Sequence, residues 1–163
     1  MTETWIIFAK AVCCGCAATG FAILFNTEKK VLPFIWMGGF LVGLVKFIFL
    51  SSLLGAGITL ASFAGAITIG LIGIPIALKL NVPTVVVNIA SVIPLVPGAF
   101  AYRTMLGLMK LTRAIDEDYS RILSETVRNG VLTLFVIIAI AIGIVVPMII
   151  FEKRITKNYL ARN

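Results

Sequence analysis

The sequence predicts an all-α integral membrane protein with about five transmembrane helices. Hydrophobic residues make up 60% of the 163 residues and charged residues only 13%, whereas soluble domains are roughly 45–50% apolar and about 25% charged. The mean hydropathy is +1.10. The apolar residues also fall into runs of about 20, the length that crosses the hydrocarbon core of a bilayer. We therefore expect residues 1–163 to form a single transmembrane domain.

Short polar or glycine-containing turns separate the first three predicted spans. These spans are residues 5–25, 31–53 and 58–80. In the second span, Gly39 and Gly43 form a GxxxG pair, which allows a neighbouring helix to approach closely. In the third span, Ser62 and Gly70 belong to a stripe of small residues at helical spacing. We predict that these four residues serve helix packing.

Lys46 is the charged residue of the second predicted span. It lies one turn beyond Gly43, on the same helix face as Gly39. A lysine within a membrane is costly unless it faces a partner or water, which makes it a functional candidate. Lys46 could instead extend towards the end of the span, where Ser51 and Ser52 indicate the interface. The sequence leaves both interpretations open.

The fourth predicted span, residues 82–109, is interrupted by Pro94 and by the pair Pro97 and Gly98. Proline removes a backbone donor and clashes with the preceding turn, so this combination predicts a break near residues 94–98. Backbone groups released by a break cannot face lipid and must be buried in protein or line a watery cavity. Broken helices of this kind bind substrates in secondary transporters. The sequence therefore predicts half of a transport site.

Polar residues flank the predicted break on both sides. Asn88 and Ser91 share one face of the helix before it, and Tyr102 and Arg103 follow in the helix after it. The N-terminus of a helix favours an anionic group. Arg103 could add a charge-assisted contact or face lipid headgroups. The predicted substrate-binding or transport-path residues are Lys46, Asn88, Ser91, Pro94, Pro97, Gly98, Tyr102 and Arg103.

The remaining sequence predicts an amphipathic helix in the interface over residues 108–126 and a last span over residues 127–151. A four-span arrangement is an alternative because Lys46 weakens the second span. With five spans, basic residues are in excess on the side that contains the C-terminus. The positive-inside rule then places the C-terminus in the cytoplasm and the N-terminus outside.

Several other functional classes do not fit. Every acidic residue lies at a helix end or in a loop, and the chain contains no histidine. The three cysteines, Cys13, Cys14 and Cys16, lie together in the first span and suit helix packing better than a metal site. The net charge of +7 is scattered over loops and helix ends, which indicates membrane topology rather than nucleic-acid binding. We therefore expect no enzyme activity, no metal and no cofactor.

The motif Ile93-Pro94-Leu95-Val96-Pro97-Gly98, followed by Tyr102, resembles the small membrane subunit of the threonine/serine exporter family. Phe21-Ala22 to Phe25-Asn26 match as well, and the resemblance covers nearly the whole chain. It implies a bacterial inner-membrane protein that pairs with a larger membrane subunit of the same family. It also implies export of threonine and serine or of a dicarboxylate such as succinate. Lys46 departs from the arginine or histidine expected nearby.

The sequence thus predicts an exporter subunit for small carboxylates, completed by the larger subunit or by further copies of this chain. Two alternatives stay open. The chain could be a membrane scaffold that stabilises the larger subunit without taking part in transport, with a purely structural break. It could also form a homo-oligomeric channel.

Overall fold

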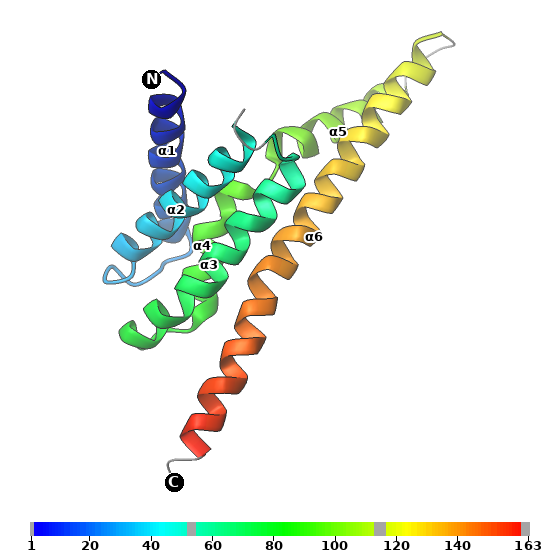
Figure 1. The fold of residues 1–163 in the computed structure, drawn as a ribbon. Coiled ribbons are helices and arrows are strands. Elements are labelled where there is room, and N and C mark those ends of the chain that lie inside the picture. Colours follow the sequence, from blue (N-terminus) through cyan, green and yellow to red (C-terminus); the bar gives the residue numbers. More distant parts are fainter. Residues whose placement is uncertain (1, 52–54, 113–116, 161–163) are drawn as a thin grey trace. The chain divides into compact units, whose positions relative to one another are not determined.

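The computed structural model describes residues 2–51, 55–112 and 117–160, which are helical without any strand (Figure 1). This confirms the predicted all-α fold. In chain order the helices are α1 (Thr2–Leu24), α2 (Leu32–Leu50), α3 (Ile58–Leu80), α4 (Thr84–Val92), the 3-10 helix η1 (Ile93–Leu95), α5 (Gly98–Leu111) and α6 (Glu117–Leu160). Pro33 stands in the first turn of α2, where its missing N–H costs nothing. Asn81 ends α3 in the left-handed conformation, which asparagine tolerates.

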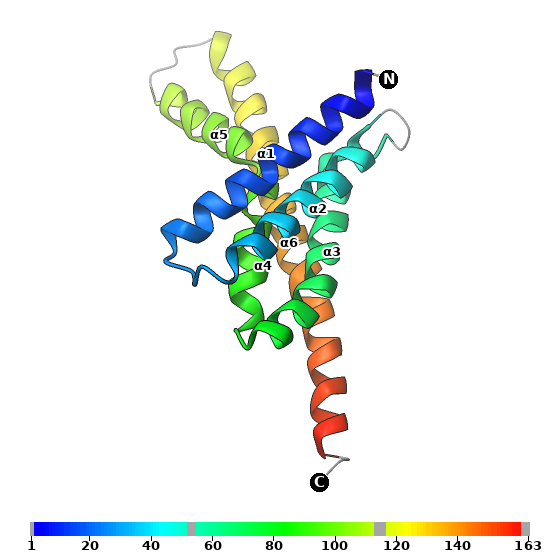
Figure 2. The same cartoon turned by 90° about the vertical axis from the view of Figure 1, so that its left-hand side faces the viewer.

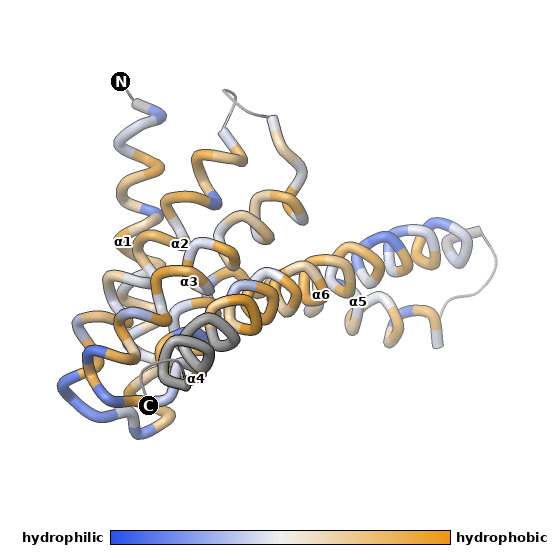
Figure 3. The backbone as a smooth tube through the Cα atoms, turned by 60° about the horizontal axis from the view of Figure 1, so that its bottom comes forward, coloured by the Kyte–Doolittle hydropathy of each residue, from blue (hydrophilic) through white to orange (hydrophobic). Residues whose placement is uncertain are grey.

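Four helices are long and apolar enough to cross a membrane: α1, α2, α3 and the stretch Tyr119–Phe151 of α6. Thr84–Leu95 and Gly98–Leu111 add a fifth if together they make one broken span. Hydrophobic residues dominate these helices, and hydrophilic residues concentrate in the turns and in the first part of α6 (Figure 3). The prediction of about five transmembrane helices is thereby confirmed.

The chain divides into two compact units, which are described separately below. The first unit is Met1–Leu95 with Ala139–Asn163, and the second is Val96–Ile138. The expectation of a single domain stays a prediction.

Glycines allow close helix contacts in the first unit. A β-carbon added at Gly39 would lie 2.5 Å from Ala18 Cβ, and one at Gly43 would lie 2.7 Å from Cys14 Cβ. Gly39 and Gly43 therefore bring α2 onto α1 (Figure 2). Gly70 of α3 faces the last part of α6, where the carbonyl oxygen of Gly143 would lie 2.9 Å from an added β-carbon.

The second unit pairs α5 with the beginning of α6. Gly107 lies against Thr126, and Thr104 lies against Gly130. Since the position on α6 rises as the position on α5 falls, the two helices are antiparallel.

The structure differs here from the predicted interfacial helix over residues 108–126. Leu108–Leu111 end α5, while Glu117–Thr126 are the first turns of α6, which continues without a break into the last span. Residues 113–116 lie outside the described part of the chain. No proline or glycine occurs between Glu117 and Asn129, and an established helix adds residues more easily than a new one starts. The predicted boundary near residue 127 is therefore absent.

Candidate functional site

The polar face of α4 is buried in the first unit. Asn88 and Ser91 have no exposed surface. Each lies against a glycine of a neighbouring helix. A β-carbon added at Gly38 of α2 would lie 2.5 Å from Ser91 Oγ, and one at Gly73 of α3 would overlap Asn88 Oδ1. The missing side chains of the two glycines therefore provide the space that the polar groups occupy.

These two polar side chains differ in their hydrogen bonding. Ser91 Oγ donates to the carbonyl oxygen of Ile35 over 3.5 Å, a long hydrogen bond. Neither Oδ1 nor Nδ2 of Asn88 has a hydrogen-bond partner among the described residues. Buried amides are paired in most proteins, and an unpaired one costs about 1–3 kcal/mol. Such a costly group calls for a structural or functional explanation.

The helix breaks after Ser91 as the prolines predict. α4 ends at Val92, η1 covers Ile93–Leu95 and contains Pro94, and α5 begins at Gly98. Some of the backbone N–H groups that were expected to be unpaired at the start of α5 form local hydrogen bonds. Gly98 N–H donates to Val96 O over 2.9 Å, and Phe100 N–H donates to Pro97 O over 3.0 Å.

Lys46 is directed at the break. Its Nζ donates to the carbonyl oxygen of Leu95, 49 positions further along the chain, over 3.3 Å. The Lys46 side chain is half-buried and Leu95 is fully buried. Gly65 of α3 makes room for Leu95, whose methyl groups would lie 3.3 Å from a β-carbon added there. A cation from α2 thus satisfies a backbone carbonyl that the broken helix leaves without a helical partner.

The first unit therefore combines three kinds of polar group near the break: an ammonium group at Lys46, a hydroxyl at Ser91 and an amide at Asn88. Ammonium and amide groups donate hydrogen bonds to carboxylate oxygens, and the ammonium also supplies the opposite charge. Across the described ranges, histidine, cysteine, aspartate and glutamate form no group of three that could hold a metal ion.

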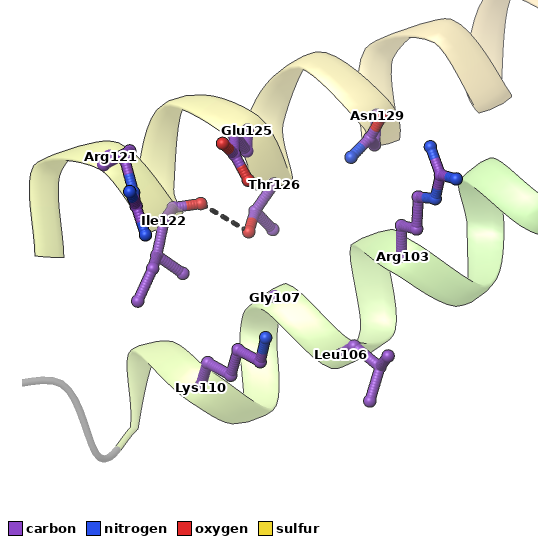
Figure 4. Close-up of a pocket in the computed structure, with 9 residues that line it drawn as sticks. All are labelled: Arg103, Leu106, Gly107, Lys110, Arg121, Ile122, Glu125, Thr126 and Asn129. Atoms are coloured by element: carbon purple, nitrogen blue, oxygen red, sulfur yellow. Dashed lines mark hydrogen bonds between the residues drawn. The ribbon is translucent and has the colours of Figure 1, made fainter. Parts of the chain in front are cut away.

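The remaining predicted residues belong to the second unit. Pro97 is buried, whereas Gly98 and Arg103 are exposed. The Tyr102 side chain is 65% exposed. Arg103 lines a cavity of about 380 Å³ between α5 and α6 (Figure 4). The structure thus brings Lys46 to the break in the first unit and places Tyr102 and Arg103 in the second.

Two of the glycines beside α4 and η1, Gly38 and Gly65, were not predicted as packing residues. Gly38, Gly65 and Gly73 mark the closest approaches to Ser91, Leu95 and Asn88. Their signal was a glycine in the interior of a predicted membrane helix, which usually indicates close packing. Asn26, a residue of the resemblance, adopts a positive φ of 54° after α1 and lines a cavity of about 460 Å³.

Comparison with known proteins decides the family. Residues 10–150 match the family described as Threonine/Serine exporter, ThrE. The chain belongs to this family. An uncharacterized protein of Haemophilus influenzae is 23% identical over 137 residues, which cover 84% of this chain and 45% of that protein. The chain thus spans less than half the length of this relative. No solved structure matches.

Family membership confirms the predicted resemblance. The family and the apolar helices together make the chain a multi-pass membrane protein of a threonine/serine exporter type.

Proposed function

We propose that the protein is one subunit of an exporter that moves small carboxylates out across the bacterial inner membrane. The cargo is threonine, serine or a dicarboxylate such as succinate. A larger membrane subunit of the same family, or further copies of this chain, completes the path. The N-terminus faces outward and the C-terminus faces the cytoplasm.

The contact between Lys46 and the break carries this proposal. The hydrogen bond from Lys46 Nζ to Leu95 O is 3.3 Å long, whereas an ammonium and a carboxylate meet at about 2.7–2.9 Å and bind more strongly. A substrate carboxylate that reaches the break would therefore displace the Leu95 carbonyl from Lys46. In this way a cation held at a helix break gives a small anion a temporary partner within the membrane.

Asn88 and Ser91 would line the next part of the path. Both are buried and poorly hydrogen-bonded, so this conformation corresponds to a closed path. Movement of α4 away from Gly38 and Gly73 would expose the hydroxyl and the amide to substrate. Such a movement requires an interruption of the helix, which is provided by Pro94, Pro97 and Gly98.

The length of a relative and the predicted topology support the proposed partner. The relative from Haemophilus influenzae extends well beyond the matched region, which fits a second membrane unit in the same protein. An odd number of spans in the first of two units would invert the second, as in other transporters built from inverted repeats. The outward N-terminus of this chain agrees with that arrangement.

Efflux measurements with Lys46 variants test the proposal. Cells that express this chain and the larger subunit are loaded with labelled threonine, serine or succinate. Lys46→Met should lower efflux of the transported compound by roughly tenfold or more, since it removes the charge that binds the carboxylate. Lys46→Arg should retain part of the efflux. Lys79→Met is the matched control, because Lys79 is exposed in the last turn of α3.

Each other outcome points to a rival function. Wild-type efflux from Lys46→Met with the complex intact would favour a scaffold that takes no part in transport. Ionic conductance from this chain alone in liposomes would favour a channel. Loss of the complex itself in Lys46→Met would assign the residue to assembly.

A further inference from the structure

The cavity between α5 and the beginning of α6 has a different chemistry from the break. Cationic side chains from both helices line it: Arg103 and Lys110 from α5, and Arg121 from α6. Among the described residues of the lining, Glu125 is acidic and these three are cationic. Its volume of about 380 Å³ lies in the range of small-ligand sites. The lining therefore suits a small anionic group.

The cavity is formed by a close contact of the two helices. Gly107 and Thr126 touch, because a β-carbon added at Gly107 would overlap Thr126 Oγ1. Arg103 lies one turn before Gly107 and Lys110 lies one turn after it, so both side chains emerge beside the contact. Figure 4 shows Arg103 near Asn129 at one end of the cavity and Lys110 opposite α6 at the other. The packing of the two helices therefore fixes the backbone positions from which the cationic side chains extend.

The sequence of α6 sets the depth of the cavity in the membrane. Residues 129–151 carry no charge, a run of 23 residues between Arg128 and Glu152. At about 1.5 Å per residue this run covers about 35 Å, enough to cross a hydrocarbon core of about 30 Å. Arg121 and Glu125 precede the run by one to two turns. The cavity therefore lies at the level of the lipid headgroups.

The outer faces of the two helices are apolar. On α5, the side chains opposite the cavity are exposed, with Tyr102 at 65%, Met105 at 63% and Met109 at 65%. On α6, Val127 and Val131 are about half exposed in the same way. Such faces suit contact with acyl chains, whereas the inner faces carry the charge. A ligand with an anionic head and apolar chains matches both surfaces.

We propose that this cavity binds the phosphate group of an anionic phospholipid, with Arg103, Lys110 and Arg121 as the cationic lining. Basic residues close to the membrane surface attract anionic lipids. Asn129 and Thr126 add polar groups to the same lining. This lipid site goes beyond the export function and does not depend on it.

Lipid binding to the full-length protein tests the site without any transport measurement. The protein is purified in detergent with any subunit that accompanies it, and is mixed with equal amounts of phosphatidylglycerol and phosphatidylcholine. Native mass spectrometry then counts the bound lipids. The wild type should bind phosphatidylglycerol in preference. R103Q/K110Q should lower that preference by about tenfold, because each basic residue near an anionic lipid contributes substantially to binding.

Two variants and one competitor complete the test. K29Q/K79Q removes two exposed cations outside the cavity and should keep the preference, and so should the charge-preserving R103K/K110R. Circular dichroism checks that each variant retains its helices. Equal binding of the two lipids by the wild type would overturn the proposal, as would loss of the preference in K29Q/K79Q or R103K/K110R. Displacement of phosphatidylglycerol by millimolar inorganic phosphate would also overturn it and indicate a site for a soluble anion.

Discussion

Two buried polar side chains, Asn88 in the first unit and Thr126 in the second, have similar surroundings but differ in their hydrogen bonds. Each touches a glycine of a neighbouring helix, Gly73 for Asn88 and Gly107 for Thr126. Thr126 Oγ1 donates to Ile122 O over 2.6 Å within its own helix. Asn88 has no such partner in the part of the chain that the structure describes. A hydroxyl one turn from a carbonyl satisfies itself, whereas a buried amide needs a group from outside its helix.

This difference separates packing from function. Thr126 completes a helix contact at little cost, so a structural role explains it. Asn88 has two buried polar atoms without a partner among the described residues, which lowers stability, and a buried group of this kind is expected to have a function. In the proposed exporter, the cargo or the water that accompanies it would supply this partner.

The largest expected effect concerns the glycine beneath Asn88. Gly73→Ala should lower the free energy of unfolding by about 1–2 kcal/mol, because the new β-carbon overlaps the side-chain amide of Asn88, which is fully buried. Gly20→Ala is the matched control. No atom lies within 4 Å of a β-carbon at that position of α1, so the higher helix propensity of alanine should leave stability unchanged or raised. Thermal unfolding in detergent measures both variants.

A double variant tests whether the contact with Asn88 causes this loss of stability. Asn88→Ala should restore most of the stability that Gly73→Ala removes, since the shortened side chain vacates the space. If the double variant were as unstable as the sum of the two single variants, the contact between Gly73 and Asn88 would not be the cause.

A smaller effect of opposite sign is expected when Asn88 loses its polarity. Asn88→Val should raise the free energy of unfolding by about 1 kcal/mol, because it removes the unpaired amide without leaving a cavity. The same variant should lower efflux of the transported carboxylate. Ser62→Ala removes the other buried group without a partner in the described ranges and lies on α3. It should stabilise the protein and leave efflux unchanged.

Asn88→Val would argue against a transport role if it stabilised the protein and kept wild-type efflux. The amide would then be a tolerated defect of packing. Loss of both stability and efflux would instead indicate that Asn88 has a partner in the assembled exporter.

Much of this arrangement could be predicted from the sequence. Hydropathy alone places the first three spans within a few residues of α1, α2 and α3, because every backbone polar group in lipid must be satisfied within a helix. Pro94 and Pro97 predict the break for the same local reason. The polar face of α4 follows from the helical spacing of Asn88 and Ser91.

The contacts between helices could not be predicted in this way. Helical periodicity assigns residues to faces, but it does not determine which faces meet. The bond from Lys46 to Leu95 and the contact of Asn88 with Gly73 join separate helices, so they depend on tertiary packing. The start of α6 was also missed, because a change from polar to apolar sequence resembles a boundary although nothing in it stops a helix.

The smallest expected effect belongs to Thr126. Thr126→Val should change the free energy of unfolding by less than about 0.5 kcal/mol, because Ile122 O also accepts the backbone bond of its own helix and is not left unpaired. Valine also fills nearly the same space against Gly107. Unfolding of Thr126→Val is compared with that of Asn88→Val under the same detergent conditions. Stabilisation of Thr126→Val as large as that of Asn88→Val would mean that burial of any polar group, satisfied or not, carries the cost. A negligible change beside a clear gain for Asn88→Val would assign the cost to the unpaired amide.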